Sequence, residues 1–149
     1  LRLPVVGAIV LKYEITRFAR SLGTLLGNGV PIIAALRIAT DTMSNLLLRH
    51  SLEAISPAMK GGGRIADAMQ KTGLFEPLAL NLVRVGEETG RLDVMLLELA
   101  KIFDRDVENA IKRGLALLEP LLILVMGMVI ATLIVSILMG ILAVNDLAV

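Results

Sequence analysis

Apolar positions recur along most of the chain with the spacing of an α-helix, and no segment shows the two-residue alternation of a β-strand. The first such face consists of Ile15 and the residues 3, 4, 7, 10 and 11 positions after it, namely Phe18, Ala19, Leu22, Leu25 and Leu26. This pattern predicts a helix from about Lys12 to Gly27-Asn28-Gly29. Glycine and asparagine tolerate the left-handed conformation of a helix C-cap, so the helix is expected to end there.

Two short helices are predicted next. Pro31 marks the first turn of the second helix, where its missing amide hydrogen costs nothing. Ser44 or Asn45 can cap the third helix. The apolar face of the third helix consists of Leu48, Leu52, Ile55 and Met59. Pro57 lies inside this pattern and is expected to kink or end the helix.

Glycine and proline also delimit a fourth and a fifth helix. The run Gly61-Gly62-Gly63 is expected to be a flexible connection to a fourth helix that ends at Gly73. The fifth is predicted to begin at Pro77 and to end near Gly90. Its inward-facing residues are expected to be Leu78, Leu82 and Val85.

The sixth predicted helix begins near Leu92 and is much longer. Its apolar positions repeat at intervals of three and four residues, and nothing breaks the pattern before Glu119-Pro120. The charge-free stretch Leu121–Val144 follows directly, so we expect one helix of about 50 residues, roughly 80 Å long. The predicted fold is all-α, an antiparallel bundle of about six helices whose last helix continues into a C-terminal transmembrane helix.

The stretch Leu121–Val144 is long enough to cross a membrane. A spanning helix needs about 20 apolar residues for a hydrocarbon core of roughly 30 Å. At about 1.5 Å per residue this stretch reaches roughly 36 Å, which allows some tilt. It is too long for a core helix and lies at the wrong end for a signal peptide. The alternative is a very apolar helix that is buried in an oligomer.

Charge gives this helix a direction. All 15 Lys and Arg precede residue 115, and Lys112 and Arg113 stand closest to the apolar stretch. Basic flanks stay on the cytoplasmic side of a membrane. We therefore expect a juxtamembrane linker at residues 1–11, a cytoplasmic helical bundle at 12–114, a transmembrane helix at 115–144 and a periplasmic tail at 145–149. The chain is also expected to continue upstream of Leu1, and its net charge of +1 does not indicate a nucleic-acid partner.

Residues suited to catalysis or metal binding are sparse. Cysteine is absent, and His50 is the only histidine, so a thiolate or histidine metal site is not predicted. The glycine run that ends in Arg64 lacks the lysine of a phosphate-binding loop. The acidic residues of 104–108 point to different sides of a helix, although a calcium site shared with another chain is an alternative. We predict no catalytic residue, metal or cofactor, and a function other than an enzyme.

One motif breaks local rules of helix stability: Gly86-Glu87-Glu88-Thr89-Gly90-Arg91-Leu92. Its two carboxylates stand at a helix C-terminus, where each costs about 0.3–1 kcal/mol when exposed. A glycine inside a helix costs about 1 kcal/mol relative to alanine. Such breaks are expected at functional sites, so the motif is a candidate partner-binding surface.

The same motif also has a structural interpretation. Gly86 can let a neighbouring helix approach closely. Arg84 and Arg91 are spaced to pair with Glu88 and Glu87 across one helical turn. The structural and binding interpretations do not exclude each other.

Further candidate residues lie at and within the membrane stretch. Lys112, Arg113, Glu119 and Pro120 mark its cytoplasmic boundary. Glu119 and Pro120 are expected either to bend the helix or to place the carboxylate at the membrane surface. Two pairs of small residues, Gly127 with Ala131 and Ser136 with Gly140, are expected to permit close helix packing on two faces.

The motif at residues 86–92 resembles the Gly-Glu-x-Ser/Thr-Gly-x-Leu signature of the type II secretion F family, inner-membrane platform proteins of type II secretion and type IV pilus machines. Residues 17–26 with Gly29-Val30-Pro31 are similar to the opening helix pair of that family. Leu118-Glu119-Pro120-Leu121 resembles its entry into the last membrane helix. Residues 62–69 match more loosely, because Arg64 stands where the family often has serine.

This resemblance implies the last third of a multi-pass protein, namely its second cytoplasmic domain and final membrane helix. The family has no known catalytic activity. The implied partners are a cytoplasmic hexameric secretion ATPase, other inner-membrane assembly-platform proteins, pilin-like subunits and the lipid bilayer, within a homo-oligomer. The ending at residues 144–149 looks more like the secretion branch than the pilus branch.

Two other classes of protein fit the pattern without the resemblance. One is a tail-anchored membrane receptor or adaptor that has a cytoplasmic helical domain. The other is a channel or transporter fragment, which is disfavoured because the spanning stretch has no ionisable residue.

Overall fold

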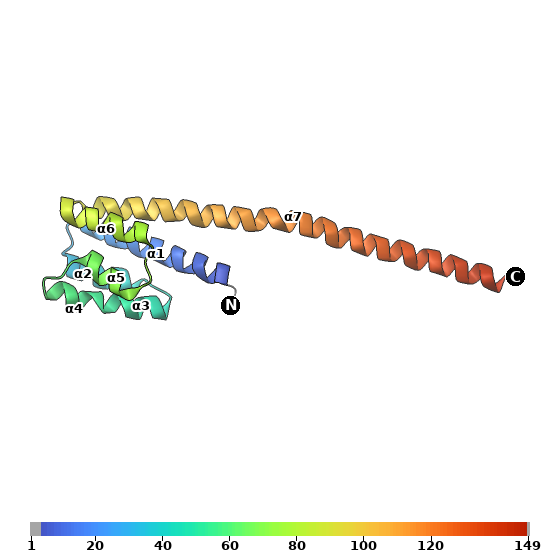
Figure 1. The fold of residues 1–149 in the computed structure, drawn as a ribbon, viewed down its shortest axis with the longest axis horizontal. Helices are drawn as coiled ribbons and strands as arrows, with labels where there is room; N and C mark the ends of the chain where they lie inside the picture. Colours follow the sequence, from blue (N-terminus) through green and yellow to red (C-terminus); the bar gives the residue numbers. More distant parts are fainter. Residues whose placement is uncertain (1–3, 149) are drawn as a thin grey trace. The chain divides into compact units, whose positions relative to one another are not determined.

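The structure, a computed structural model, describes residues 4–148, and all regular secondary structure within that range is helical. The helices are α1 (Pro4–Gly27), α2 (Ile32–Asp41), α3 (Leu46–Glu53), α4 (Ile55–Lys60), α5 (Ile65–Thr72), α6 (Pro77–Thr89) and α7 (Leu92–Leu147) (Figure 1). Contacts divide the chain into two units, with the boundary between Glu108 and Asn109. The predicted all-α fold and its long, apolar last helix are confirmed.

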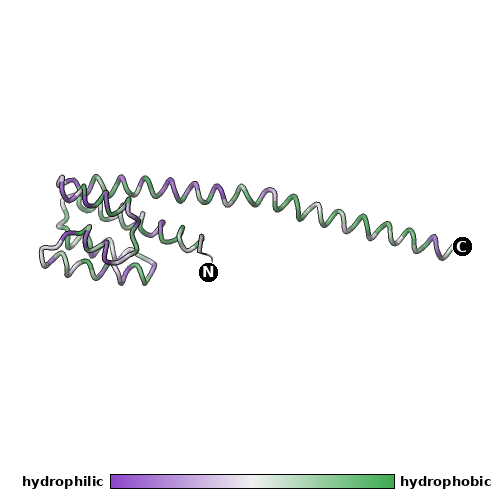
Figure 2. The backbone as a smooth tube through the Cα atoms, viewed as in Figure 1, coloured by the Kyte–Doolittle hydropathy of each residue, from purple (hydrophilic) through white to green (hydrophobic). Residues whose placement is uncertain are grey.

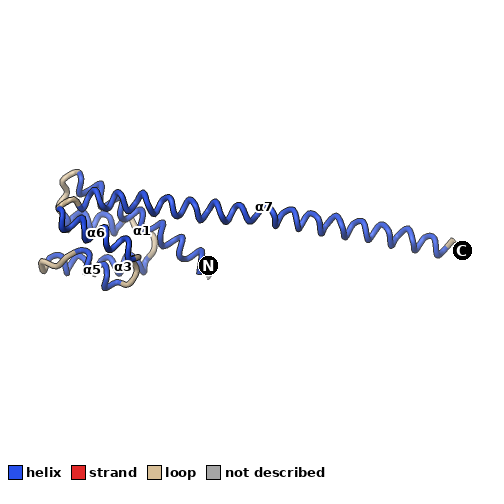
Figure 3. Tube along the Cα trace, turned by 45° about the horizontal axis from the view of Figure 1, so that its top comes forward, coloured by secondary structure: helices blue, strands red, loops and turns tan. Residues whose placement is uncertain are grey.

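Helices α1 to α6 and the first turns of α7 form the first unit, and short loops join them (Figure 3). Residues of the predicted α1 face, Ile15, Phe18, Ala19 and Leu22, are buried in its core. Helix α7 adds Leu96, Leu99, Ala100 and Phe103 to the same core. Helix α1 packs on α2 and α5 packs on α6, and α7 joins the same core from the far end of the sequence.

Helix α1 begins at Pro4, earlier than the predicted start near Lys12. Proline fits the first turn of a helix, and a single Gly7 costs only about 1 kcal/mol relative to alanine. Neither residue therefore stops the helix. Residues 1–3 of the expected linker and Val149 of the expected tail lie outside the described residues. The role of residues 1–11 as a juxtamembrane linker stays a prediction.

The predicted third helix is interrupted at Ala54, which separates α3 from α4. Pro57 has no amide hydrogen for the carbonyl four residues earlier, and its ring clashes with that carbonyl. That carbonyl belongs to Glu53, the last residue of α3. Of the two predicted N-caps, Asn45 caps α3, because its side chain accepts hydrogen bonds from Leu47 N at 3.0 Å and Leu48 N at 3.1 Å.

The predicted inward face of α6 is wrong for Leu78 and Val85, whereas Leu82 is partly buried and packs against the core. Leu78 and Val85 are 43% and 45% exposed, and the buried residues are Ala79, Val83 and Gly86. Asn81, Arg84 and Glu88 recur one turn apart on one side of this helix, so its apolar side is broad, and the predicted face lay at the edge of that side rather than at its centre. Small side chains face the interior because α5 and α7 approach α6 closely, and only small residues fit between closely packed backbones.

The second unit, from Asn109, consists of the rest of α7. Its large apolar side chains from Leu115 to Val144 are exposed, and the helix is almost uniformly hydrophobic beyond Pro120 (Figure 2). Among the described residues this is one helix long and apolar enough to cross a membrane, and none of its most apolar window is buried in the chain. That exposure distinguishes it from the core helix of a soluble domain.

Candidate functional site

The turn between α6 and α7 contains the motif of residues 86–92. Gly90 ends α6 in the left-handed conformation, with φ of 68°. The amide of Arg91 donates to the Gly86 carbonyl at 2.9 Å, which closes the turn. A Cβ atom at residue 86 would lie 2.8 Å from Leu92 Cα, closer than real Cβ contacts. The turn therefore requires glycine at both positions, because α7 starts directly against the backbone of α6.

Glu87 caps a different helix. Its Oε1 accepts a hydrogen bond from Ile65 N at 2.5 Å, and its Oε2 accepts one from Ala66 N at 3.1 Å. These amides are at the start of α5, whose own N-cap residue, Arg64, makes no capping hydrogen bond with its side chain. A carboxylate is favoured there by the helix dipole and by the unsatisfied amides. Glu87 lies unfavourably at the C-terminus of α6, but its carboxylate lies favourably at the N-terminus of α5. The second effect offsets the first.

Glu88 and Thr89 occupy the outer side of the turn. Glu88 lies 3.8 Å from Arg64 Nη1, and both side chains are 53% exposed, so this ion pair contributes little. The hydroxyl of Thr89 donates to the Val85 carbonyl at 2.7 Å. Arg84, which was predicted to pair with Glu88, instead donates to Gln70 Oε1 at 3.3 Å. The two carboxylates therefore have partners on α5 and the loop before it, not the arginines of their own turn.

The glycine run before α5 forms a hydrogen-bonded turn. Gly63 N donates to the Ala58 carbonyl at 3.0 Å, and Gly62 adopts a φ of 80°. A Cβ atom at residue 63 would lie 2.8 Å from the same carbonyl oxygen. The run thus has a steric requirement for glycine beyond the flexibility that was predicted, and it places the first amides of α5 at the Glu87 carboxylate.

Helix α1 meets the start of α7 beside this turn. A Cβ atom at Gly23 would lie 3.0 Å from both Leu97 Cγ and the Asp93 carbonyl oxygen. A shallow cavity between these elements is lined by Leu26, Ile32, Gly63, Arg64, Gly86, Glu87, Gly90, Leu92 and Asp93. The motif therefore lies at a junction of α1, α5, α6 and α7, where it holds the first turns of α7. Such an arrangement fixes one helix against another, and the lining residues contain no nucleophile–base pair.

A cluster of charged side chains joins α1 to α7 further along. Lys12 Nζ lies 2.7 Å from Asp106 Oδ2, 3.2 Å from Glu76 Oε1 and 4.6 Å from the centre of the Phe103 ring. Burial lowers the pKa of Lys12, but the hydrogen bonds and charges of Asp106 and Glu76 outweigh it and raise the pKa above its usual 10.5. The cluster holds a protonated lysine between two carboxylates and an aromatic face.

Asp104 is engaged in the same way, because it pairs with Arg20 of α1. The sequence placed Asp104 and Asp106 on different sides of a helix and did not identify the partner of either. The available signal was weak, because Lys12 and Arg20 are two cations about two turns apart on α1 and their spacing does not by itself indicate acidic partners on α7. No group of three or more acidic or histidine side chains that could hold a metal ion occurs in the described part of the chain.

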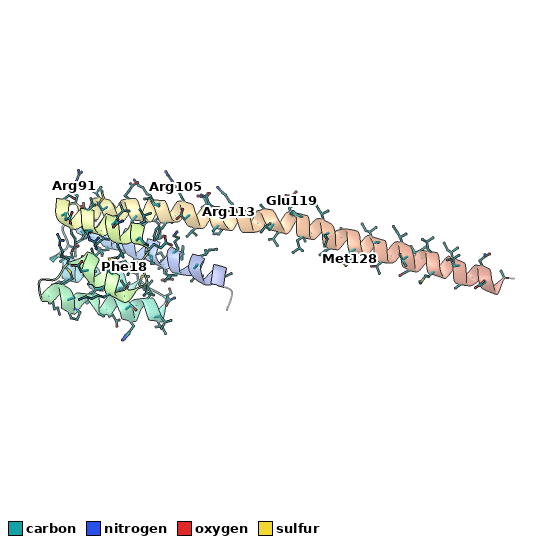
Figure 4. The ribbon with its side chains drawn as sticks, viewed as in Figure 1. Phe18, Arg91, Arg105, Arg113, Glu119 and Met128 are labelled. Atoms are coloured by element: carbon teal, nitrogen blue, oxygen red, sulfur yellow. The ribbon has the colours of Figure 1, made fainter. Side chains whose placement is uncertain are left out.

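Glu14 was also missed. Its side chain is buried although it is charged, and its Oε2 accepts a hydrogen bond from Ser44 N at 3.1 Å. This contact ties α1 to the connection between α2 and α3. The signal was its position one turn before Phe18, on the apolar face of α1. Phe18 points into the interior of the bundle, whereas Arg91 points outward (Figure 4).

The predicted membrane residues all lie in the second unit. Arg113 Nε donates to the Asn109 carbonyl at 3.3 Å, and Glu119 and Pro120 border a groove on α7. Ser136 donates its hydroxyl hydrogen to the Thr132 carbonyl at 2.8 Å, so its polar group is satisfied within the helix. No atom lies within 4 Å of a Cβ atom built at Gly127 or Gly140. Helix packing at these residues, and at Ala131, stays a prediction.

Comparison with known proteins identifies relatives of the chain. The family model described as type II secretion system (T2SS), protein F matches residues 18–140. A type II secretion system protein F of Xanthomonas campestris is 42% identical over 124 residues, covering 83% of this chain and 31% of the relative. The protein of the same name from Pseudomonas aeruginosa is 33% identical over 147 residues, which are 99% of this chain and 36% of that protein.

Relatives from pilus assembly are similar to the same degree. The type IV pilus assembly protein PilC of Pseudomonas aeruginosa is 32% identical over 136 residues, covering 91% of this chain and 36% of the relative. The chain thus spans about a third of the length of the curated relatives it matches.

Proposed function

Because the chain belongs to the type II secretion system protein F family, we propose that it forms the C-terminal part of a non-enzymatic inner-membrane platform. In this proposal the helical bundle receives motion from a cytoplasmic ATPase, and α7 carries it to the membrane, where pilin-like subunits are added to a filament. The names of the relatives support a secretion or pilus-assembly machine. The exposed apolar part of α7 supports its place in a bilayer.

The observation that carries this proposal is the way α7 begins. Its first residue packs against Gly86, and the neighbouring Glu87 binds the first amides of α5. From there α7 is helical to Leu147, past the whole apolar stretch. A displacement of the bundle would therefore reach α7 through packed backbone and charge-assisted hydrogen bonds, because neither contact passes through a flexible linker.

Residues for partner recognition follow from the same geometry. Glu87 is occupied by α5, so the exposed Glu88 and Arg91 are the members of the motif available to an ATPase or another platform protein. The apolar stretch would place the bundle in the cytoplasm and residues 145–149 in the periplasm, since the basic residues all precede it.

The test is to weaken α7 between the bundle and the membrane. In the full-length protein, Ala110→Gly with Ile111→Gly should stop filament growth or secretion while the protein still inserts. Each glycine costs about 1 kcal/mol of helix stability relative to alanine. The matched control is Ile111→Ala, which removes the same side chain but keeps a good helix former. Filament growth of the double-glycine variant equal to that of the control would refute transmission through α7.

A further inference from the structure

Glu119 is an isolated carboxylate at the start of the apolar stretch. Its neighbours one turn away along α7 are Leu115, Ala116, Leu122 and Ile123, none of which is polar. Between Glu108 and Asp146 the chain has no other acidic residue. Within the described part of the chain, Glu119 forms no hydrogen bond or ion pair with its side chain. An ionised group at the edge of a hydrocarbon layer needs a counter-charge or water.

A second unsatisfied acceptor lies one turn before it. Pro120 is inside α7 and has no amide hydrogen, so the Ala116 carbonyl lacks the donor that residue 120 would supply in an unbroken helix. Serine and threonine hydroxyls often satisfy such carbonyls in membrane helices, but residues 112–119 contain neither. No hydroxyl in this segment is therefore available to that carbonyl, which leaves it open to a donor from another segment.

Both acceptors border the same groove. It is lined by Ala116, Glu119, Pro120, Ile123 and Leu124, all of which belong to the second unit. The lining is mostly apolar, so it offers the carboxylate no polar side chain as a partner. A carboxylate beside a free carbonyl, on an apolar wall, fits a group that is positively charged and donates more than one hydrogen bond.

We propose that this groove binds a lysine or arginine side chain from another membrane segment of the assembly. The charge of Glu119 selects a cation, and the free carbonyl of Ala116 takes a second hydrogen bond from the same ammonium or guanidinium group. Arginine and lysine near helix ends reach this depth because their long apolar stems lie along the helix while the charge stays at the boundary. The proposal rests on α7 crossing a membrane and does not require coupling to an ATPase.

The experiment places a photo-crosslinking amino acid at Ile123 of the full-length protein in its own cells. Crosslinked peptides are mapped by mass spectrometry in the protein with Glu119 unchanged and in the variants Glu119→Asp and Glu119→Gln. The expected adduct is on a membrane segment, within one helical turn of a lysine or arginine. Its yield should persist in Glu119→Asp and fall about tenfold in Glu119→Gln, the change that a loss of about 1.4 kcal/mol produces.

Further variants distinguish the contributions of the Glu119 carboxylate and the Ala116 carbonyl to the crosslinking yield from general effects of substitution. Pro120→Ala returns an amide donor to the Ala116 carbonyl, so it should lower the yield while Glu119 is unchanged. Asp146→Asn removes the other acidic residue after Glu108 and should leave the yield unchanged. Once the partner residue is mapped, Glu119→Lys should abolish the adduct. In that variant, replacing the partner's lysine or arginine by an acidic residue should restore the adduct.

Several outcomes would overturn the proposal. They are an adduct of equal yield in Glu119→Gln, an adduct on lipid alone, an adduct on a segment without a nearby cation, or no adduct. An adduct on lipid would show that a headgroup ammonium supplies the charge. The double-glycine test at residues 110 and 111 does not bear on these yields, because crosslinking does not depend on filament growth. Failure of one proposal therefore leaves the other intact.

Discussion

The contact between Glu87 and the start of α5 predicts a large loss of stability when its carboxylate is removed. Glu87 accepts two backbone hydrogen bonds, at 2.5 Å and 3.1 Å, from amides that have no other cap. Hydrogen bonds to charged groups contribute about 1.5–3 kcal/mol each, and part of this loss is offset because alanine removes a carboxylate from the C-terminal end of α6. We expect Glu87→Ala to lower the free energy of unfolding by about 2–3 kcal/mol.

The assay is urea unfolding of the chain in mild detergent, followed by circular dichroism. Glu88→Ala is the matched control, since it removes a neighbouring carboxylate whose ion pair with Arg64 is exposed. It should cost less than about 0.5 kcal/mol. A loss in Glu87→Ala no larger than in Glu88→Ala would refute the capping role.

A second substitution tests the mechanism rather than the size of the effect. Arg64 occupies the N-cap position of α5 with an extended backbone, but its side chain forms no capping hydrogen bond. A serine there can accept from the amides of the first turn, a contribution of about 1 kcal/mol. Arg64→Ser should therefore restore about 1 kcal/mol in the Glu87→Ala background and much less in the original chain. Equal effects in both backgrounds would show that Glu87 does not act as the cap.

Four other predictions follow from the structure and the sequence. Gly86→Ala should destabilise the chain by about 1–3 kcal/mol in the same assay, because its Cβ atom would meet the Leu92 backbone at 2.8 Å. Gly7→Ala, where nothing lies within 4 Å, should instead stabilise by up to about 1 kcal/mol. The pKa of Lys12 is raised in the folded state, above its usual 10.5. Its ion pairs therefore stabilise the fold fully at pH values below the unfolded-state pKa. This contribution is lost as the pH rises through the folded-state pKa. Lys12→Met should remove that alkaline loss in unfolding measured across pH. The chain has no cysteine, so the variants Lys71→Cys and Asp146→Cys each contain one thiol that can be labelled in cells. A membrane-impermeant thiol reagent added from the periplasmic side should label only the Asp146→Cys variant. Labelling of the Lys71→Cys variant would contradict the predicted topology.

Sequence reasoning succeeded where one segment carried its own signal. The apolar face of α1, the turn at Gly90 and the length of α7 each depend on residues close together in the chain. It failed for Leu78 and Val85 of α6, because the apolar side of that helix is broad and only tertiary packing selects Ala79, Val83 and Gly86 as its buried centre. The prediction near Pro57 was correct in kind, and the break came at Ala54 because proline acts on the carbonyl four residues before it.

The candidate site shows the same division at the level of single residues. The sequence marked Gly86 and Glu87 as exceptions to helix stability, but it could not identify what compensates them. Glu87 and Ile65 are separated by 22 residues along the chain, and Glu14 and Ser44 by 30. Periodicity describes neighbours one or two turns apart, so contacts of this range leave no local signal.

By itself, the sequence determined the helical class, the apolar stretch long enough to cross a membrane and the position of the motif, since these follow from local spacing and composition. The tertiary structure decided that Glu87 caps α5, that Lys12 and Arg20 neutralise Asp106 and Asp104, and that α7 starts against the backbone of Gly86. The physical reason is that hydrogen bonds and ion pairs depend on distances in space, which packing of the whole bundle sets.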